Sequence, residues 1–321
     1  MSLAMVFPGQ GSQSVGMLGE LAAAHAVVGR TFAEASSVLG YDLWQLVSAG
    51  PTEQLNQTEC TQPAMLCAGI ATWRVWQELG GNAPQQLAGH SLGEFTALVC
   101  AGVLDFPAAV ALVRDRGRYM QEAVPAGSGA MAALLGLADQ DAEQACREAA
   151  AGEVVEAVNY NAPGQIVIAG AAGAVQRAIA AAKARGAKRA LLLPVSVPAH
   201  SSLMRSAAEK LRARLADVKF SAARIGYVSA VDAVEHRDPE DIRALLVRQL
   251  ASPVRWSATV LALCARGATL LVECGPGKVL TALNRRIDRR PELSCLALED
   301  SATLQAALSA ASTQSQPGSA S

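Results

Sequence analysis

Apolar and polar positions alternate with two different periods along most of the chain, and this pattern predicts strands separated by helices. A short apolar run at residues 3–7 predicts a buried strand, and residues 84–88 predict a second. Apolar residues recur at helical spacing over about 17–40, 61–79 and 106–123. Strands that alternate with helices favour a mostly parallel sheet with helices on both faces.

The pattern changes between residues 124 and 196. Strands are predicted at 130–137, 154–160, 165–170 and 189–195, and helices at 139–151 and 174–185. The order β-α-β-β-α-β is that of a ferredoxin-like unit. We therefore expect this segment to form a subdomain inserted into the larger domain.

The alternating pattern resumes after Pro198. Helices are predicted at 201–216, 238–251, 255–266, 277–287 and from 301, and strands at 224–229, 269–274 and 293–298. The expected organisation is an α/β core from 1–123 and 197–311, the subdomain at 124–196, and a polar, disordered tail at 312–321.

Composition narrows the function classes. A chain of 321 residues with 17% charged residues and a net charge of −1 shows no sign of a nucleic-acid-binding surface. No apolar run is long enough to span a membrane and the first residues lack a signal-peptide pattern, so we expect a cytoplasmic protein. The seven cysteines form no C-x-x-C pair and lie mostly in apolar runs, which favours buried free thiols in a reducing compartment. No histidine or cysteine cluster has metal-ligand spacing.

The motif Gly89-His90-Ser91-Leu92-Gly93 has the form Gly-x-Ser-x-Gly and lies between a predicted strand and a predicted helix. This context favours a nucleophile elbow, in which the serine is exposed on a sharp turn, over a plain strand-to-helix turn. A second glycine-rich loop, Pro8-Gly9-Gln10-Gly11-Ser12-Gln13, follows the first strand. It lacks the lysine of a phosphate-binding loop and the third glycine of a dinucleotide fingerprint.

A serine nucleophile needs a base, and His200 is the candidate that remains by elimination. The side chain of His90 should point away from that of Ser91, and His25 and His236 are expected to be exposed. His200 lies between a predicted strand and a predicted helix, shortly after Pro198. The alternative is a helix-capping or core histidine.

Backbone groups and an arginine complete the candidate site. The N–H of Leu92 and the N–H of Gln10 are the expected donors to an oxyanion. Arg114, Arg116 and Arg118 lie within about one helical turn, and one of them could face inward as a carboxylate clamp. A structural salt bridge is the alternative that their spacing alone favours.

Taken together, the motifs resemble those of malonyl-CoA:acyl carrier protein transacylases, the discrete enzymes of bacterial type II fatty acid synthesis. The resemblance runs from residue 3 to about residue 310. The segments that carry it, in chain order, are Phe7 to Gln13, Gly89 to Glu94, Arg116-Gly117, Met120 to Pro125, Asn161 to Gln165, Val197 to His200 and Gly275 to Leu280.

The resemblance implies an α/β-hydrolase-like core with an inserted ferredoxin-like subdomain. It implies that Ser91 carries malonyl as an ester, that His200 is the base, and that Gln249 orients His200. The other implied roles are oxyanion binding by Gln10 and Leu92 and substrate binding by Arg116, Gln10, Asn161 and Gln165. Coenzyme A thioester and acyl carrier protein are the expected partners, with no cofactor, nucleic acid or membrane, and the chain is expected to act as a monomer.

The sequence leaves three alternatives open. The first is a malonyl transacylase of another pathway, such as polyketide synthesis or malonate decarboxylation. The others are a serine esterase or thioesterase and a non-catalytic scaffold. Ala199 stands where most relatives are expected to have serine, which bears on acyl-group selectivity.

Two basic clusters are candidates for docking an acidic carrier protein. They are Lys183, Arg185, Lys188 and Arg189, and Arg285, Arg286, Arg289 and Arg290. A solvated charged face is the alternative for either cluster.

Overall fold

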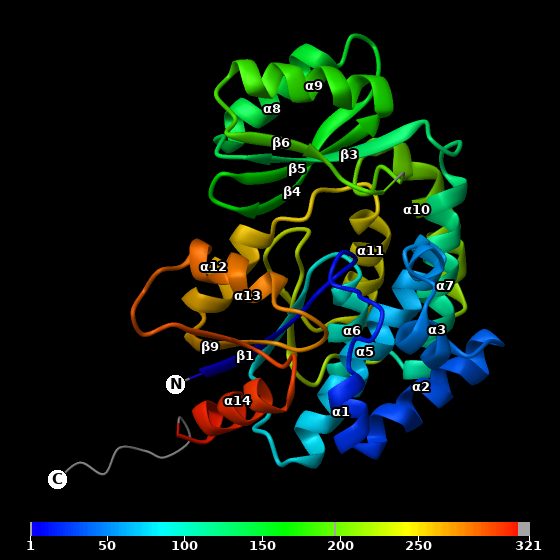
Figure 1. Cartoon of the computed structure of the whole chain (residues 1–321), viewed down its shortest axis with the longest axis vertical. Helices are drawn as coiled ribbons and strands as arrows, with labels where there is room; N and C mark the ends of the chain where they lie inside the picture. Colours follow the sequence, from blue (N-terminus) through cyan, green and yellow to red (C-terminus); the bar gives the residue numbers. More distant parts are fainter. Residues whose placement is uncertain (1, 196, 314–321) are drawn as a thin grey trace.

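Six strands form the larger sheet, sheet A, in the order β10-β9-β1-β2-β7-β8. The computed structural model that defines them describes residues 2–195 and 197–313. The strands are β1 (Ser2–Phe7), β2 (Gln86–Gly89), β7 (Gly226–Val228), β8 (Glu235–His236), β9 (Ala268–Glu273) and β10 (Ser294–Ala297). Two of them, β1 and β9, are labelled side by side in Figure 1. Every pair is parallel except β7–β8, which confirms the mostly parallel sheet.

Side chains of β1 alternate between two apolar clusters, as expected for a strand covered on both faces. Leu3, Met5 and Phe7 belong to the larger cluster, and Ala4 and Val6 belong to the other. The larger cluster includes α1 (Gly19–Ala24), α2 (Ala26–Leu39), α3 (Leu43–Ala49), α4 (Thr52–Leu55), α5 (Thr58–Glu78), α6 (Gly93–Cys100), α7 (Phe106–Glu122), α10 (Arg205–Ala216), α11 (Pro239–Gln249) and α14 (Ser301–Thr313). The other cluster includes α12 (Trp256–Ala265) and α13 (Val279–Ile287).

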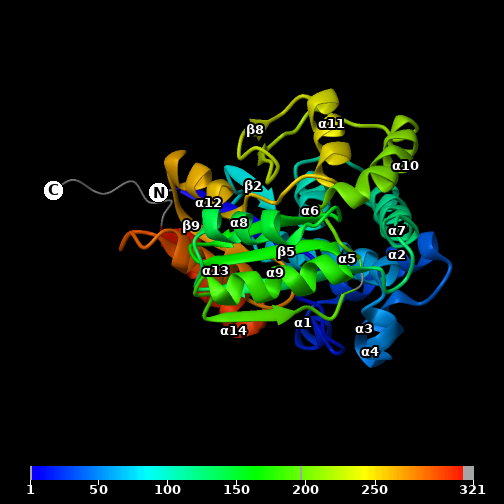
Figure 2. The same ribbon diagram turned by 90° about the horizontal axis from the view of Figure 1, so that it is seen from above.

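Four antiparallel strands form sheet B, in the order β4-β5-β3-β6. They are β3 (Gly129–Leu135), β4 (Val155–Ala162), β5 (Gln165–Ala171) and β6 (Arg189–Leu192). The helices α8 (Asp139–Ala149) and α9 (Ala172–Ala184) pack on the face of sheet B that is turned away from the core (Figures 1 and 2). The βαββαβ order predicted from the sequence is confirmed.

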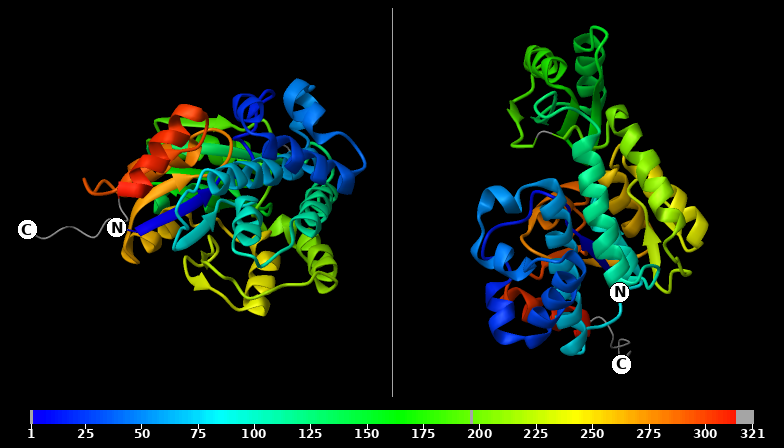
Figure 3. Two further views of the ribbon diagram at one scale, coloured as in Figure 1. Left: turned by 90° about the horizontal axis from the view of Figure 1, so that it is seen from below. Right: turned by 90° about the vertical axis from the view of Figure 1, so that its right-hand side faces the viewer.

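Sheet B is attached to the core through the segment before α12. The N–H of Tyr160 donates to the carbonyl oxygen of Val254 at 2.9 Å, and the N–H of Val254 donates to Val158 at 2.8 Å. The inner face of sheet B carries Met131 and packs against the segment that leads to His200. In the right-hand view of Figure 3, sheet B and its helices form a separate unit above the core, and α7 leads from the core toward this unit.

Several predicted boundaries are wrong for identifiable reasons. The helix expected over 17–40 is interrupted at His25, whose backbone is extended with φ −132°. The short helices α3 and α4 and the two-residue strand β8 were not predicted, since each has too few residues to establish a period. A 3-10 turn at Ser202–Met204 precedes α10, so the helix expected from 201 starts later.

The last helix overlaps the start of the tail predicted at 312–321. Helix α14 extends to Thr313, so residues 312 and 313 are helical and do not belong to a disordered tail. Residues 314–321 lie outside the described part of the chain. Across 2–195 and 197–313, no helix combines the length and apolar character that a membrane crossing needs.

Candidate active site

Ser91 lies on a sharp turn between β2 and α6, with a positive φ of 52° that L-residues rarely adopt. A Cβ atom at Gly93 would lie 2.0 Å from the carbonyl oxygen of Phe7, and one at Gly89 would lie 2.0 Å from the carbonyl carbon of Gly93. Neither position therefore has room for a side chain. The elbow predicted from the spacing of the glycines is present, and strain at Ser91 is of the kind that functional sites retain.

Ser91 and His200 are in contact although 109 positions separate them. The distance from Ser91 Oγ to His200 Nε2 is 2.7 Å, and His200 Nδ1 lies 2.8 Å from the backbone carbonyl oxygen of Gln249. A carbonyl oxygen can only accept, so Nδ1 carries the proton and Nε2 is free to accept from the serine hydroxyl. The structure thus places the expected nucleophile, base and orienting residue together, with the backbone of Gln249 as the orienting group.

His200 is kept neutral by its surroundings. Burial, with the nearby positive charge of Arg116, lowers the pKa of His200 from 6.5 to about 3. Its φ of 65° is also in the left-handed region, so both members of the pair have strained backbones. A neutral imidazole is the form that can take a proton from serine.

The two expected oxyanion donors follow adjacent parallel strands. Phe7 of β1 is paired with Gly89 of β2, and the loop after each strand emerges at the same edge of sheet A. The backbone N–H groups of Gln10 and Leu92 have no acceptor within residues 2–195 and 197–313. Both groups are therefore available to a carbonyl oxygen at Ser91.

Arg116 is the inward-facing member of the three arginines. Its side chain is 1% exposed, and it donates to Gln62 Oε1 at 2.8 Å and to Gln249 Oε1 at 2.9 Å. Its Nε has no acceptor, and no carboxylate in the described residues lies within salt-bridge distance of its guanidinium. Burial lowers its pKa from 12.5 to about 10, which leaves it charged at neutral pH.

The neighbouring arginines behave differently. Arg114 and Arg118 are on the exposed side of α7 and both pair with Asp115. The salt-bridge alternative therefore holds for these two residues and not for Arg116. A buried, charged fork without an acid partner is suited to bind the carboxylate of a ligand.

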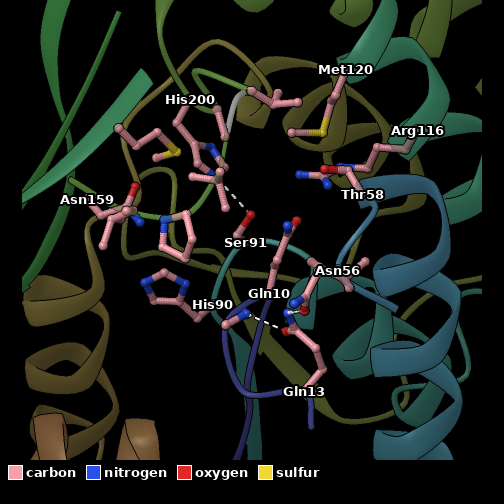
Figure 4. A pocket seen from close by; sticks show the side chains of 18 residues that line it. Gln10, Gln13, Asn56, Thr58, His90, Ser91, Arg116, Met120, Asn159 and His200 are labelled. Carbon is pink, nitrogen blue, oxygen red and sulfur yellow. Dashed lines mark hydrogen bonds between the residues drawn. The ribbon is translucent and has the colours of Figure 1, made fainter. Parts of the chain in front are cut away.

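A cavity of about 360 Å³ joins these groups, between the core and the inner face of sheet B. His200 and Arg116 point toward Ser91 from different sides, with Gln10 below (Figure 4). The wall also includes Ala199, Met131 and Asn159. A pocket of this size with few convergent polar groups is typical of small-molecule sites.

Two wall or support residues were not found by sequence reasoning. Asn159 Oδ1 is buried at the cavity and has no donor, and Gln62 holds Arg116 from α5. Neither lies in a recognisable motif. Gln62 precedes Pro63 inside a long buried helix, and only the packing of α5 on α7 brings it to Arg116.

Asn161 and Gln165 do not line the cavity. Asn161 Oδ1 lies 2.8 Å from His90 Nε2, and the His90 ring packs near Trp256. Gln165 is at the surface, where it accepts from Arg286. The structure places the first in a supporting position and the second on the outside, so neither has direct access to a ligand in this cavity.

The other histidines also differ from expectation. His25 and His236 are half-buried rather than exposed, and His236 Nε2 lies 3.3 Å from both carboxylate oxygens of Asp232. All seven cysteines are free, and six of them are buried.

The acyl transferase domain family matches residues 4–298. This chain belongs to the acyl transferase family. Ser91, His200 and the cavity between them all lie within the matched residues.

Several acyl transferases that are more than half identical to this chain have names that specify the acyl group and the acceptor. The chain is 56% identical over 305 residues to the malonyl CoA-acyl carrier protein transacylase of Salmonella typhimurium. The alignment covers 95% of this chain and 98% of that protein. The chain also superposes on the crystal structure of an acyl carrier protein S-malonyltransferase from Vibrio cholerae, with a TM-score of 0.92 and 56% identity. The superposition covers 95% of this chain and 99% of that one.

A further acyl transferase structure contains a partner. It is a malonyl-transacylase in complex with its type II polyketide synthase acyl-carrier protein, with a TM-score of 0.95 and 55% identity. The match covers 97% of this chain and all of that one (100%). The fold, including the inserted subdomain, is thus shared at full length.

Proposed function

We propose that this acyl transferase moves malonyl from malonyl-CoA, through an ester on Ser91, to the phosphopantetheine thiol of acyl carrier protein. The observation that carries the proposal is Arg116, a buried cation with no acid partner in the same cavity as Ser91 and His200. A malonyl group carries a free carboxylate that could pair with this guanidinium, whereas an acetyl group has none. The names of the full-length relatives agree with this substrate.

In the first half-reaction, His200 Nε2 takes the proton of Ser91 Oγ as this oxygen attacks the thioester carbonyl carbon. The carbonyl oxygen becomes an oxyanion that accepts from the N–H groups of Gln10 and Leu92. Collapse of the tetrahedral intermediate breaks the C–S bond, and coenzyme A leaves as a thiol with the proton from His200. Malonyl remains as an ester on Ser91.

The second half-reaction reverses these roles. His200 takes the proton of the phosphopantetheine thiol, sulfur attacks the ester carbonyl, and Ser91 leaves with the proton returned by His200. The bonds formed and broken balance without any cofactor of the enzyme. Water competes with the thiol as acceptor of the malonyl group. Transfer is therefore faster than hydrolysis only if the phosphopantetheine arm fills the cavity and excludes water.

The orienting group fits this chemistry. A neutral backbone carbonyl at Gln249 fixes the imidazole tautomer but stabilises an imidazolium less than a carboxylate does. Exchange between a thioester and an ester is close to thermoneutral, so we infer that this weaker stabilisation of the imidazolium is sufficient for the reaction. Asn159 Oδ1, buried without a donor, is suited to accept from an amide N–H of the pantetheine arm.

The pH profile of acylation follows from the state of His200. In the free enzyme its pKa lies at about 3, so kcat/KM for malonyl-CoA is expected to stay nearly flat from about pH 5 to 8. A bound malonyl carboxylate neutralises Arg116, which raises the pKa of His200 in the complex. The acid limb of kcat should therefore appear at higher pH than that of kcat/KM. Stopped-flow acylation rates measure both, and an acid limb of kcat/KM near pH 6.5 would contradict the assignment.

The carrier protein docks on one end of sheet B in this proposal. Leu135 of β3 lies opposite Arg189 of β6 on one side and opposite Gln165 of β5 on the other. Arg286 donates a hydrogen bond to the side chain of Gln165. The two basic clusters noted in the sequence therefore meet here. Arg185, by contrast, pairs with Glu148, and Arg290 pairs with Asp288. From this end, β6 leads toward Leu193 on the cavity wall.

Reversing two of these charges tests the docking surface. The double variant Lys188→Glu, Arg189→Glu should raise the KM for carrier protein about tenfold at low salt, with the difference shrinking at high salt. Formation of malonyl-Ser91 from malonyl-CoA should be unchanged. Lys219→Glu, an exposed reversal after α10, is the control. An equal effect of the control, or none of the double variant, would rule this surface out.

One experiment tests the function itself. The protein is incubated with malonyl-CoA or acetyl-CoA, with and without carrier protein, and the intact masses of both proteins are followed. A malonyl adduct on the enzyme that moves to carrier protein supports the proposal. Rapid hydrolysis without carrier protein would instead indicate a thioesterase, and no adduct would indicate a scaffold.

The same assay separates the pathways. We infer fatty acid biosynthesis in the cytoplasm, because the curated relatives are malonyl CoA-acyl carrier protein transacylases. Comparison of a fatty-acid carrier protein with a polyketide carrier protein as acceptor distinguishes the two. A clear preference for the polyketide carrier would move the enzyme to that pathway.

A further inference from the structure

Glu94, in the first turn of α6, is a buried carboxylate that the reaction as described does not use. Its exposure is 0%, and it has no salt-bridge partner in residues 2–195 and 197–313. An isolated buried charge is strongly unfavourable unless hydrogen bonds satisfy it. Its neighbours therefore show what this carboxylate does.

Every hydrogen-bonding neighbour of Glu94 donates to it. Oε1 accepts from the backbone N–H of Ala230 at 2.5 Å and from Ser229 Oγ at 3.2 Å. Oε2 accepts from Nε2 of Gln249. Burial raises the pKa of the Glu94 carboxyl, whereas these hydrogen bonds lower it and, like the nearby charge of Arg116, favour the ionised form.

The side-chain amide of Gln249 connects Glu94 to the active site. Its Nε2 also donates to the backbone carbonyl of Ser91 at 3.0 Å, and its Oε1 accepts from Arg116 at 2.9 Å. The two ends of an amide have nearly the same shape but opposite hydrogen-bonding character. Rotated by 180°, the amide would present a donor to Arg116 and an acceptor to the Ser91 carbonyl, and both contacts would be lost.

We propose that Glu94 is a positioning residue that fixes the orientation of the Gln249 amide and, through it, the guanidinium of Arg116. The inference rests on the proposed malonyl transfer, because the alignment of Arg116 matters only for an acyl group with a carboxylate. Glu94 contributes this without a direct salt bridge to Arg116, which would occupy the fork that malonyl needs.

A glutamine at position 94 cannot replace the carboxylate, although it has the same shape. The N–H of Ala230 is a fixed backbone donor, so the Oε1 of the new amide must face it. Its NH₂ group then faces Nε2 of Gln249, donor against donor. This repulsion displaces the Gln249 amide from the position in which its Nε2 donates to the Ser91 carbonyl and its Oε1 accepts from Arg116.

The variant Glu94→Gln is therefore expected to lose selectivity for malonyl. The ratio of kcat/KM for malonyl-CoA to that for acetyl-CoA should fall about tenfold, mainly through a higher KM for malonyl-CoA, because one charged hydrogen bond is lost. Removal of a negative charge alone would act in the opposite direction, since it would strengthen malonyl binding. A general structural defect would reduce both substrates equally and leave the ratio unchanged.

Two further variants complete the experiment. Glu94→Asp keeps an acceptor-only group and should retain the wild-type ratio even where total activity falls. Ser229→Ala removes one donor from Glu94 without touching the amide and should also retain it. An unchanged or increased ratio in Glu94→Gln, or an equal loss in Glu94→Asp, would overturn the inference.

Failure of this inference is distinguishable from failure of the proposed function. If the wild-type protein forms no malonyl ester at Ser91, the function is wrong whatever the variants do. If the ester forms and the malonyl-to-acetyl ratio of Glu94→Gln matches that of the wild type, only the role of Glu94 is wrong. Thermal unfolding of each variant, with the fraction of protein that can be acylated, shows whether the isosteric change left the fold intact.

Discussion

Replacement of Ser91 by alanine is expected to abolish the malonyl adduct and reduce malonyl transfer at least about 10⁴-fold. Ser91 Oγ is the atom held 2.7 Å from His200 Nε2, and its loss removes the nucleophile while the cavity, Arg116 and the oxyanion donors remain. Malonyl-CoA should therefore still bind. Intact-mass measurement after incubation with malonyl-CoA, together with a binding assay on the same sample, checks both statements.

His200→Ala is the companion variant. It keeps the hydroxyl but removes the base, so the ester should form slowly, with the acylation rate rising with pH as hydroxide replaces the imidazole. A malonyl adduct of normal yield on Ser91→Ala would place the nucleophile elsewhere. A normal acylation rate in His200→Ala would remove the histidine from the mechanism.

The parts of the site that the sequence predicted are those set by local chain geometry. The elbow needs a residue without a side chain at Gly89 and at Gly93, because a Cβ atom at either position would lie only 2.0 Å from another backbone atom. Such a requirement is visible in the spacing of the motif. The position of Gln10 beside Ser91 follows in the same way from parallel pairing of the first two strands of the core.

The parts that were not predicted depend on contacts between distant segments. Spacing could not select Arg116 over Arg114 and Arg118, since only the packing of α7 against neighbours such as α5 and α10 decides which face of the helix is buried. The same holds for Glu94, which belongs to the serine motif but acquires its role from Ala230 and Gln249. Sequence alone also cannot show that the backbone of Gln249, rather than its side chain, orients His200.

The placement of Asn161 away from the cavity has a local cause. In a regular strand, Asn159 and Asn161 would lie on one face. The pairing of β4 with β5 shifts register between Ala157 and Asn159 and again between Tyr160 and Ala162. Such irregularities re-aim side chains, so Asn159 lines the cavity while Asn161 contacts His90.

Replacement of Arg116 by alanine is expected to change which acyl group the enzyme prefers. Malonyl transfer should fall about 10²-fold in kcat/KM, because the substrate carboxylate loses its charged, bidentate partner. Acetyl transfer should stay the same or rise. In the wild type an acetyl group leaves the buried guanidinium without an anion, and the variant removes that penalty.

Two other substitutions separate charge from geometry at this position. Arg116→Lys keeps a positive charge but lacks the planar fork, so malonyl transfer should be intermediate between the wild type and Arg116→Ala. Arg114→Ala, on the exposed side of the same helix, should leave both substrates unaffected. Rates with malonyl-CoA and acetyl-CoA, measured under identical conditions, give the ratio for each variant. Equal loss of malonyl and acetyl transfer in Arg116→Ala would mean that this residue supports the fold of the site and does not select the substrate.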